Sequence, residues 1–227
     1  MVKDFSEKVG SDGGDGSRSK GQASRENILL TAAKLATTKG LDGLSIGDLA
    51  AEVGMSKSGL YAHFKSKEDL ELATIETAAA IFDREVLRAV PAATSGSKKL
   101  LALVDSFLAY LKRQVFPGGC FFAAVGMELD TRPGAARDKV IEVMQTWLSL
   151  LRQCLLDAEA LGEIDENADI EQAVFETHAM LAAANFLFVM TSDTTKLTQA
   201  RRGVEHVLAR LAIRAHPKRK RSPRGKA

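Results

Sequence analysis

The sequence predicts an all-α protein in which a small three-helix domain precedes a larger helical domain. Apolar residues recur with helical spacing along most of the chain, and no stretch after Leu70 keeps the two-residue alternation of a strand. Glycine and proline mark a few well-separated breaks, such as Gly40, Pro91 and Gly162, rather than closely spaced turns between strands. With 45% hydrophobic and 26% charged residues among 227, the composition is that of a globular protein.

The pattern predicts about nine helices, each bounded by a capping or breaking residue. The expected ranges are 24–38, 46–53, 57–64, 67–89, 98–113, 119–129, 133–161, 169–190 and 195–212. Gly40, Gly54 and Gly162 end helices because glycine enters the left-handed region without a steric penalty. Pro117 breaks the chain after the fifth helix, and Pro133 opens the seventh, since its fixed φ suits a first helical turn.

The most informative segment is residues 45–70, with the sequence SIGDLAAEVGMSKSGLYAHFKSKEDL. Ser45 is a helix N-cap, and the apolar residues after it form one buried stripe that ends at a glycine. Ser56 caps a second short helix, whose inward positions are Leu60 and Phe64. Two short helices joined by a tight glycine turn are the arrangement that presents one helix to the DNA major groove.

This segment resembles the DNA-binding domain of the tetracycline-repressor (TetR) family. The family has a serine- or threonine-started helix, a glycine turn, a recognition helix ending in Leu-Tyr-x-x-Phe, and then an x-Ser-Lys-Glu-x-Leu run. The matching residues in this chain are Leu60, Tyr61, Phe64, Ser66, Lys67, Glu68 and Leu70. The resemblance covers about residues 24–72 and implies a nine-helix fold with a helix-turn-helix near its N-terminus.

The resemblance also implies which residues approach DNA. Lys57 and Ser58 would face base edges, whereas most of the others would lie near phosphates. The complete set of expected DNA-binding residues is Ser45, Gly47, Ser56, Lys57, Ser58, Gly59, Tyr61, His63 and Lys67. Gly59 replaces a hydroxyl residue that is frequent in the family, and Gly47 replaces a long side chain that reads a base in some members. Lys67 opposes the dipole of its helix, so an anion partner would explain its position, although each lysine can also be an ordinary solvated side chain.

Four segments are expected along the chain. Residues 1–23 form a disordered, Gly/Ser/Asp-rich arm, 24–72 the DNA-binding domain, 73–214 an effector-binding and dimerisation domain, and 215–227 a basic, disordered tail. The tail carries six Lys/Arg residues and no acid, which leaves a net charge of −4 for the rest of a chain whose total is +2. A body with that charge depends on the local cluster around the recognition helix to bind DNA. The tail either adds nonspecific phosphate affinity or is solubilising.

The chain carries no signal for secretion or for a membrane. Its N-terminal arm is not a signal peptide, and the longest nearly apolar stretch, 179–190, is too short to span a bilayer. Cys120 and Cys154 have neither disulfide nor metal-ligand spacing. We therefore expect a cytoplasmic protein with two reduced thiols and no membrane contact.

The larger domain is rich in aromatic residues and methionine between positions 82 and 147. The segment GGCFFAAVGMELDTRPGAARDKV resembles the middle of one C-terminal subgroup of TetR-like regulators, and in the family the fourth to seventh helices enclose a ligand cavity. The expected pocket residues are Phe82, Phe107, Tyr110, Phe116, Cys120, Phe121, Phe122, Met127, Met144, Trp147 and His178. Such a set suits a small apolar or aromatic effector, and the alternative is that most of these residues are plain core.

The last two helices of the family pair with a second subunit as a four-helix bundle, so this resemblance implies a homodimer. One stripe of small and apolar residues on 169–190 and one on 195–212 fit that role. The expected interface residues are Phe175, Ala179, Ala182, Phe186, Val189, Val204, Val207, Leu208 and Leu211. These residues can equally pack within one subunit. His178 and Asn185 share a helix face, where they can hydrogen-bond a ligand or each other across a dimer.

These features favour a ligand-responsive repressor that binds a palindromic site on double-stranded DNA as a homodimer. Its two recognition helices would enter successive major grooves about 34–36 Å apart. None of the four histidines follows a glutamate by three residues, and no nucleophile elbow, P-loop or zinc-ligand cluster is present. We therefore expect no metal, no cofactor and no enzymatic activity. The alternative is a constitutive or architectural DNA-binding protein without an effector.

Overall fold

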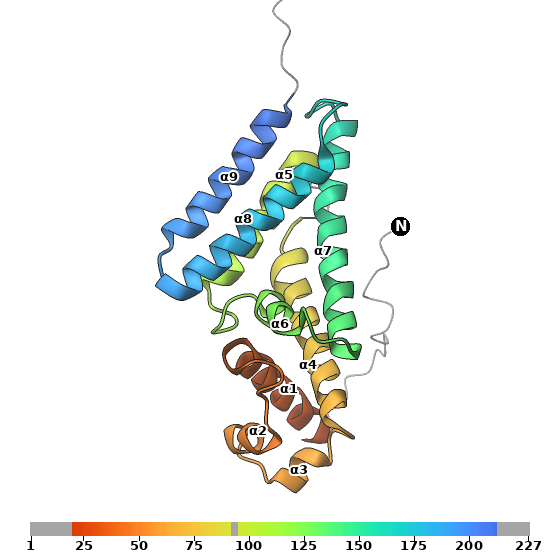
Figure 1. The fold of residues 1–227 in the computed structure, drawn as a ribbon, viewed down its shortest axis with the longest axis vertical. Helices are drawn as coiled ribbons and strands as arrows, with labels where there is room; N and C mark the ends of the chain where they lie inside the picture. The colour runs from red at the N-terminus through yellow and green to blue at the C-terminus, as the bar shows by residue number, and fades with distance from the viewer. Residues whose placement is uncertain (1–19, 92–94, 213–227) are drawn as a thin grey trace, which may run out of the picture.

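The computed structural model describes residues 20–91 and 95–212, and these fold into an all-α protein, as the sequence predicts (Figure 1). The nine α-helices within those ranges are α1 (Lys20–Lys39), α2 (Ile46–Glu52), α3 (Lys57–Tyr61), α4 (Lys67–Phe82), α5 (Gly96–Lys112), α6 (Phe121–Leu129), α7 (Ala135–Ala160), α8 (Ile170–Thr191) and α9 (Thr195–Leu211). A π-helical turn, η2 (Asp83–Leu87), continues α4.

Most helix boundaries lie within two residues of those expected, and three differ more. α1 begins at Lys20, so residues 20–23 of the expected arm are helical, while the rest of the arm and the tail lie outside the described residues. α3 ends at Tyr61, and Phe64 follows it in the turn. The single helix expected over 67–89 is α4 followed by η2, in which the Arg88 amide donates to the Asp83 carbonyl five residues earlier (2.9 Å).

The helices form two groups that share one continuous core (Figure 1). α1, α2 and α3 lie together at one end, and α4 runs from this end into the larger group beside α7. α6 lies at the junction, where it contacts both α1 and α7. α8 and α9 form an antiparallel hairpin on the outside, packed on α5 and α7. The fold therefore places the expected DNA-binding helices at one tip and the expected dimerisation helices on a flank.

Candidate DNA-binding surface and effector domain

Serine caps fix the starts of the two helices that form the candidate DNA-binding surface. Ser45 Oγ accepts the backbone N–H of Asp48 (2.9 Å), and Ser56 Oγ accepts that of Gly59 (3.1 Å). Gly54 makes the turn between the helices at φ +68°, which a residue with a side chain rarely adopts. Because its cap uses only an acceptor, Ser45 keeps its O–H as a donor for a phosphate oxygen.

The two faces of α3 differ in burial. Leu60 and Phe64 are buried in the core of the small domain. Lys57 and Ser58 are exposed on the opposite face, together with Tyr61, of which 57% is exposed. The buried face anchors α3, and the exposed face is left with hydrogen-bonding groups of the kind that contact bases and phosphates.

The other expected DNA-binding residues of α2 and α3 lie at the same tip of the molecule. They are the exposed Ser45 and Ser56 and the half-buried Gly47, Gly59 and His63. Arg25 of α1 adds a cation that the sequence motif did not indicate, since its guanidinium lies 5.0 Å from the centroid of the Phe64 ring. The two residues are 39 positions apart, so only the fold brings them together.

Lys67, expected near a phosphate, is bound within the protein. Its Nζ donates to the carbonyl oxygen and to Oδ1 of Asp42, both at 2.9 Å, and lies 3.5 Å from Glu71 Oε1. The hydrogen bond with Asp42 raises the pKa of Lys67, and it lowers the pKa of the Asp42 carboxyl. The anion partner expected for a lysine in this first helical turn is therefore a carboxylate of the same chain.

Asp42 is also held by the larger domain. Arg132, which follows α6, donates to Asp42 Oδ2 (2.8 Å), and Glu128 of α6 accepts the backbone N–H groups of Leu41 and Asp42 (2.7 and 2.8 Å). We refer to Asp42, Lys67, Glu128 and Arg132 as the Asp42 cluster. It joins the loop before α2, the start of α4 and the end of α6. No sequence pattern indicates this cluster, because its members come from three separate segments.

Five of the expected pocket residues form a cluster of packed rings. Phe82 lies at its centre, with ring centroids 5.6–6.3 Å from those of Phe107, Tyr110, Phe122 and Trp147, and it meets each nearly edge to face. All five are buried. This aromatic cluster fills the interior between α4, α5, α6 and α7.

Three further pocket candidates extend the aromatic cluster toward α8. Phe116, Cys120 and Phe121 are buried, and Phe116 lies 6.2 Å from Tyr110 and 5.9 Å from Phe121 between ring centroids. The Cys120 amide donates to the side-chain oxygen of Asn185 (2.8 Å). Asn185 Oδ1 therefore satisfies a backbone group of its own subunit, while a contact of its side-chain amide group with a ligand or partner stays a prediction.

Met127 does not belong to a pocket, contrary to the sequence-based prediction. On α6 the inward positions are Phe121, Phe122, Val125 and Leu129, so Met127 falls on the opposite face and is 75% exposed. Met144 and His178 are half-buried beside the core. A methionine near aromatic residues in sequence was an insufficient signal, because helical phase decides which way it faces.

Polar groups are few in this interior. The Tyr110 hydroxyl is buried beside Cys120 and makes no well-formed hydrogen bond within the described part of the chain. Nδ1 of His178 is likewise buried without a hydrogen-bond partner among those residues. Burial raises the pKa values of Tyr110 and Cys120 and lowers that of His178, so all three are neutral near pH 7.

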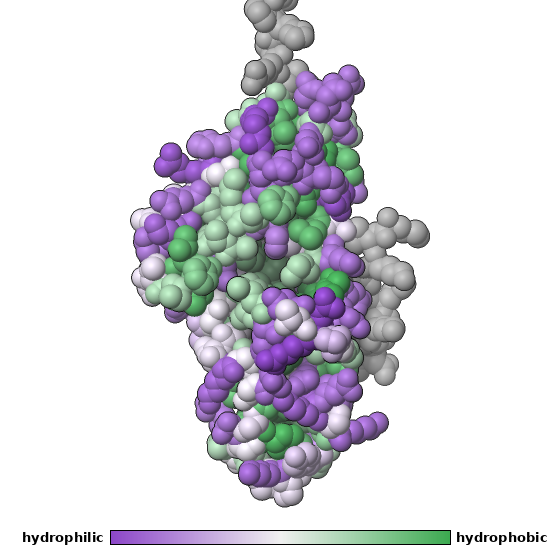
Figure 2. Space-filling model, in the orientation of Figure 1, coloured by the Kyte–Doolittle hydropathy of each residue, from purple (hydrophilic) through white to green (hydrophobic). Residues whose placement is uncertain are grey.

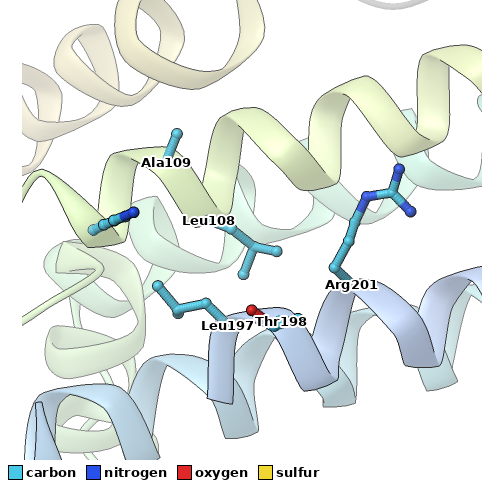
Figure 3. Close-up of a pocket in the computed structure, with 6 residues that line it drawn as sticks. Leu108, Ala109, Leu197, Thr198 and Arg201 are labelled. Carbon is cyan, nitrogen blue, oxygen red and sulfur yellow. The ribbon is translucent and has the colours of Figure 1, made fainter. Parts of the chain in front are cut away.

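Among the hollows on the described residues, two lie outside the five packed rings of the aromatic cluster. An open groove of about 290 Å³ runs between α5 and α9 (Figure 3). It is lined by Leu108, Ala109, Lys112, Leu197, Thr198 and Arg201. Arg201 is already paired with Asp105 and with Glu205 (2.9 Å), which leaves the groove little net charge. The second hollow, of about 30 Å³, is lined by Phe116 and Val189 among others.

The expected interface residues divide between the surface and the core. Figure 2 shows apolar residues gathered along α8 on one face of the molecule. The exposed members are Phe175, Ala179, Ala182, Phe186 and Val189, which we call the α8 stripe. Phe175 and Phe186 leave 67% and 56% of their surfaces exposed. The α8 stripe is therefore an exposed apolar surface formed by residues of one helix face.

On α9 the prediction of interface residues is wrong for Val204, Val207 and Leu211, and for Leu208 it stays a prediction. Val204, Val207 and Leu211 are buried, and Leu208 is half-buried. α9 turns this apolar side toward α8 and α5 of its own subunit, which is the alternative that the sequence left open. Gly203 leaves room for Met180 of α8, because a Cβ at position 203 would collide with the Met180 sulfur in its present position.

Contrary to the expectation from its sequence, α8 is long and apolar enough to cross a membrane, judged by length and composition alone. Seven of its residues, among them Val174, Leu181 and Phe188, are buried against the rest of the fold. The hydropathy of α8 is therefore explained by one face in the core and one face in the α8 stripe.

Two short helices, α2 and α3, are joined by a turn at Gly54. The apolar face of α3 is buried and its polar face is exposed. This arrangement is that of a helix-turn-helix DNA-binding protein. Residues 28–74 match the profile described as bacterial regulatory proteins, tetR family, and residues 96–204 match the tetracyclin repressor-like C-terminal domain. The chain belongs to the TetR family and is a DNA-binding transcriptional regulator.

Two curated relatives match parts of the chain. It is 42% identical over 52 residues to the uncharacterised HTH-type transcriptional regulator YerO of Bacillus subtilis (strain 168), a match that covers 23% of this chain and only 18% of YerO. It is 18% identical over 140 residues to the HTH-type transcriptional repressor DhaR of Mycobacterium sp. (strain GP1), covering 62% of this chain and 69% of DhaR.

Solved structures extend the likeness over the whole fold. A TetR transcriptional regulator from Chloroflexus aurantiacus J-10-FL has a TM-score of 0.76 and 28% identity, covering 84% of this chain and 94% of its own. AibR, solved in complex with isovaleryl coenzyme A and operator DNA, has a TM-score of 0.66 and 23% identity, covering 83% of this chain and 98% of its own.

Proposed function

We propose that this protein is an effector-responsive repressor that binds a palindromic operator as a homodimer. The observation that carries the proposal is the exposed polar face of α3, at the tip of the molecule and backed by the buried Leu60. Lys57 reads guanine, whose O6 and N7 accept from lysine in the major groove. Ser45 and Tyr61 contact phosphates, which position α3 without reading sequence.

The α8 stripe pairs with the same surface of a second copy. Its alanines, Ala179 and Ala182, let two helices approach closely, and Phe175 and Phe186 supply apolar area at either end. Pairing through this surface would relate the two copies of α3 by a two-fold axis, as a palindromic operator requires. Acting on the chromosome as a regulator, the protein would work in the cytoplasm.

The aromatic cluster is the site of a small apolar or aromatic effector. Phe82, Phe107 and Trp147 supply flat apolar surface, and the unpaired hydroxyl of Tyr110 supplies a polar point that orients a ligand. Because the rings pack against one another, an effector must displace some of them. Phe122 lies on α6 with Glu128, so a displaced ring shifts the helix that holds the Asp42 cluster and changes the DNA-bound geometry. AibR, with a similar fold, was solved with an acyl-coenzyme A and operator DNA together.

A second candidate is a constitutive DNA-binding protein without an effector. One observation supports it: the rings of the aromatic cluster fill the space in which an effector would bind. In that case the cluster is only the core of the larger domain.

Selection of double-stranded DNA from a random pool by the purified protein tests the first part of the proposal. A symmetric consensus is expected, and a selection without any consensus would contradict it. Aromatic and acyl compounds are then screened for release of that DNA, with the emission of Trp147, the only tryptophan, recorded in parallel. An effector in the aromatic cluster changes the emission at the concentrations that release DNA. Release with unchanged emission, and with a normal response of Trp147→Phe, would place the effector elsewhere, and no release by any compound would favour the constitutive protein.

A further inference from the structure

Gly47, the second residue of α2, lies under the end of the Lys57 side chain. A Cβ at position 47 would stand 3.0 Å from Lys57 Cε and 3.3 Å from its Nζ, closer than ordinary side-chain contacts allow. The same point is 3.7 Å from Ser45 Oγ. Lys57 therefore reaches from the start of α3 across to α2, through the space that a side chain at position 47 would occupy.

This path depends on the absence of a side chain at position 47. Cε and Nζ, the end of the Lys57 side chain, lie beside the bare backbone of Gly47 at the start of α2. Position 47 thus decides where the cation of the recognition helix is presented.

We infer that Gly47 is a specificity-determining position that acts through Lys57 without contacting DNA. By supplying no side chain, Gly47 lets one lysine from α3 occupy the junction of α2 and α3, and it fixes which base pair that lysine reads. The inference rests on the proposed function, since it assumes that Lys57 faces base edges. It assigns position 47 the role of a positioning residue.

Gly47→Ala separates this role from a role in folding. Gly47 has ordinary helical backbone angles and is not among the glycines with positive φ. The atoms that a methyl group would meet belong to the flexible end of Lys57, which can swing away. Alanine is also the better helix former. The variant should therefore unfold at the same temperature as the wild type or higher.

The experiment compares dissociation constants for the selected operator and for its single-base-pair variants. The proteins are wild type, Gly47→Ala, Lys57→Ala and the double variant. Lys57→Ala should weaken operator binding by about 5- to 150-fold per base contact and flatten the preference at one symmetric position. Gly47→Ala should weaken it by at least about fivefold at the same position. Adding Gly47→Ala to Lys57→Ala should change nothing further, because no lysine remains to be displaced.

Gly126→Ala is the matched control. Gly126 is another helical glycine, on α6, and its added methyl would meet Met144 and Val140 at an ordinary 3.7 Å. It should bind the operator like the wild type. Wild-type base preference in Gly47→Ala, or additive losses in the double variant, would overturn the inference while leaving the proposed function intact. A wild type that selects no operator would overturn the proposed function and this inference with it.

Discussion

The DNA-binding tip and the aromatic cluster are organised by contacts of very different range. At the tip, each serine cap bonds an amide three residues further on, and the decisive side chains point outward. In the aromatic cluster, rings from Phe82 to Trp147 meet across 65 positions of sequence and point inward. A recognition surface can therefore be read from a short motif, whereas a ligand site emerges only when distant helices pack.

The Asp42 cluster is where the two regions meet. Lys67 belongs to the first turn of the helix that leaves the tip, and Glu128 and Arg132 belong to the helix and loop that border the aromatic cluster. One exposed carboxylate, that of Asp42, thus faces both domains. We expect single substitutions in different parts of the molecule to change stability, dimerisation and DNA affinity independently of one another.

The largest effect is expected from Phe186→Glu in the α8 stripe. A charge within this surface should block pairing of two copies and leave the subunit folded, because Phe186 is exposed. Loss of the second DNA-binding tip should weaken operator binding by about 10²–10⁴-fold, the gain that two linked sites provide. Sedimentation and operator titration measure both quantities. Met127→Glu, which places the same charge at an exposed site on α6, should remain dimeric; a dimeric Phe186→Glu would remove the α8 stripe from the interface.

Removing a ring should lower stability in the aromatic cluster, whereas at the DNA-binding tip it should lower DNA affinity. Phe82→Ala, at the centre of the aromatic cluster, should lower the free energy of unfolding by about 3–5 kcal/mol because packing is removed from the core. Tyr61→Ala, at an exposed site, should change it by no more than about 0.5 kcal/mol and still weaken DNA binding. Denaturant titration and operator binding of both variants check this. Equal destabilisation by the two would show that the tip depends on its exposed ring for stability.

Substitution of Lys67 tests whether the Asp42 cluster also contacts DNA. If Lys67 shares its charge between Asp42 and a phosphate, Lys67→Ala should weaken binding to all sequences alike. It should also lower the log–log salt slope by about 0.9 for each phosphate that the lysine neutralises, and a dimer carries two such lysines. Asp42→Asn should act in the opposite direction, since it removes the competing carboxylate. An unchanged salt slope in Lys67→Ala would assign this lysine to the Asp42 cluster alone.

The smallest effect concerns pH. Burial lowers the pKa of His178 below its ordinary value near 6.5, so the unfolded chain binds the proton more readily than the folded one. The free energy of unfolding should therefore fall as the pH drops below about 6.5. His178→Gln should lose less stability over the same range in denaturant titrations at each pH. Equal losses would show that His178 is accessible to protons in the folded protein.

The sequence predicts features that depend on local contacts better than features that depend on contacts between distant segments. The all-α class, the positions of the helices and the buried Leu60 and Phe64 followed from caps and spacing, because these are local signals. Helical phase placed the α8 stripe on the surface but misplaced Val204 and Val207, because spacing identifies an apolar face without identifying what covers it. The Asp42 cluster and the contact of Gly47 with Lys57 depend on how segments meet in space, and no local pattern indicates them.

In the proposed complex, two copies of this chain are joined by the α8 stripe and present two α3 helices to one palindromic site. Hydroxyl-radical footprinting of the selected operator, with wild type and Phe186→Glu side by side, examines the dimer and its spacing on DNA at once. The wild type should protect two symmetric half-sites about 34–36 Å apart, and the variant should give no protection at the same concentration. A single asymmetric protected site, occupied equally by both proteins, would contradict this arrangement.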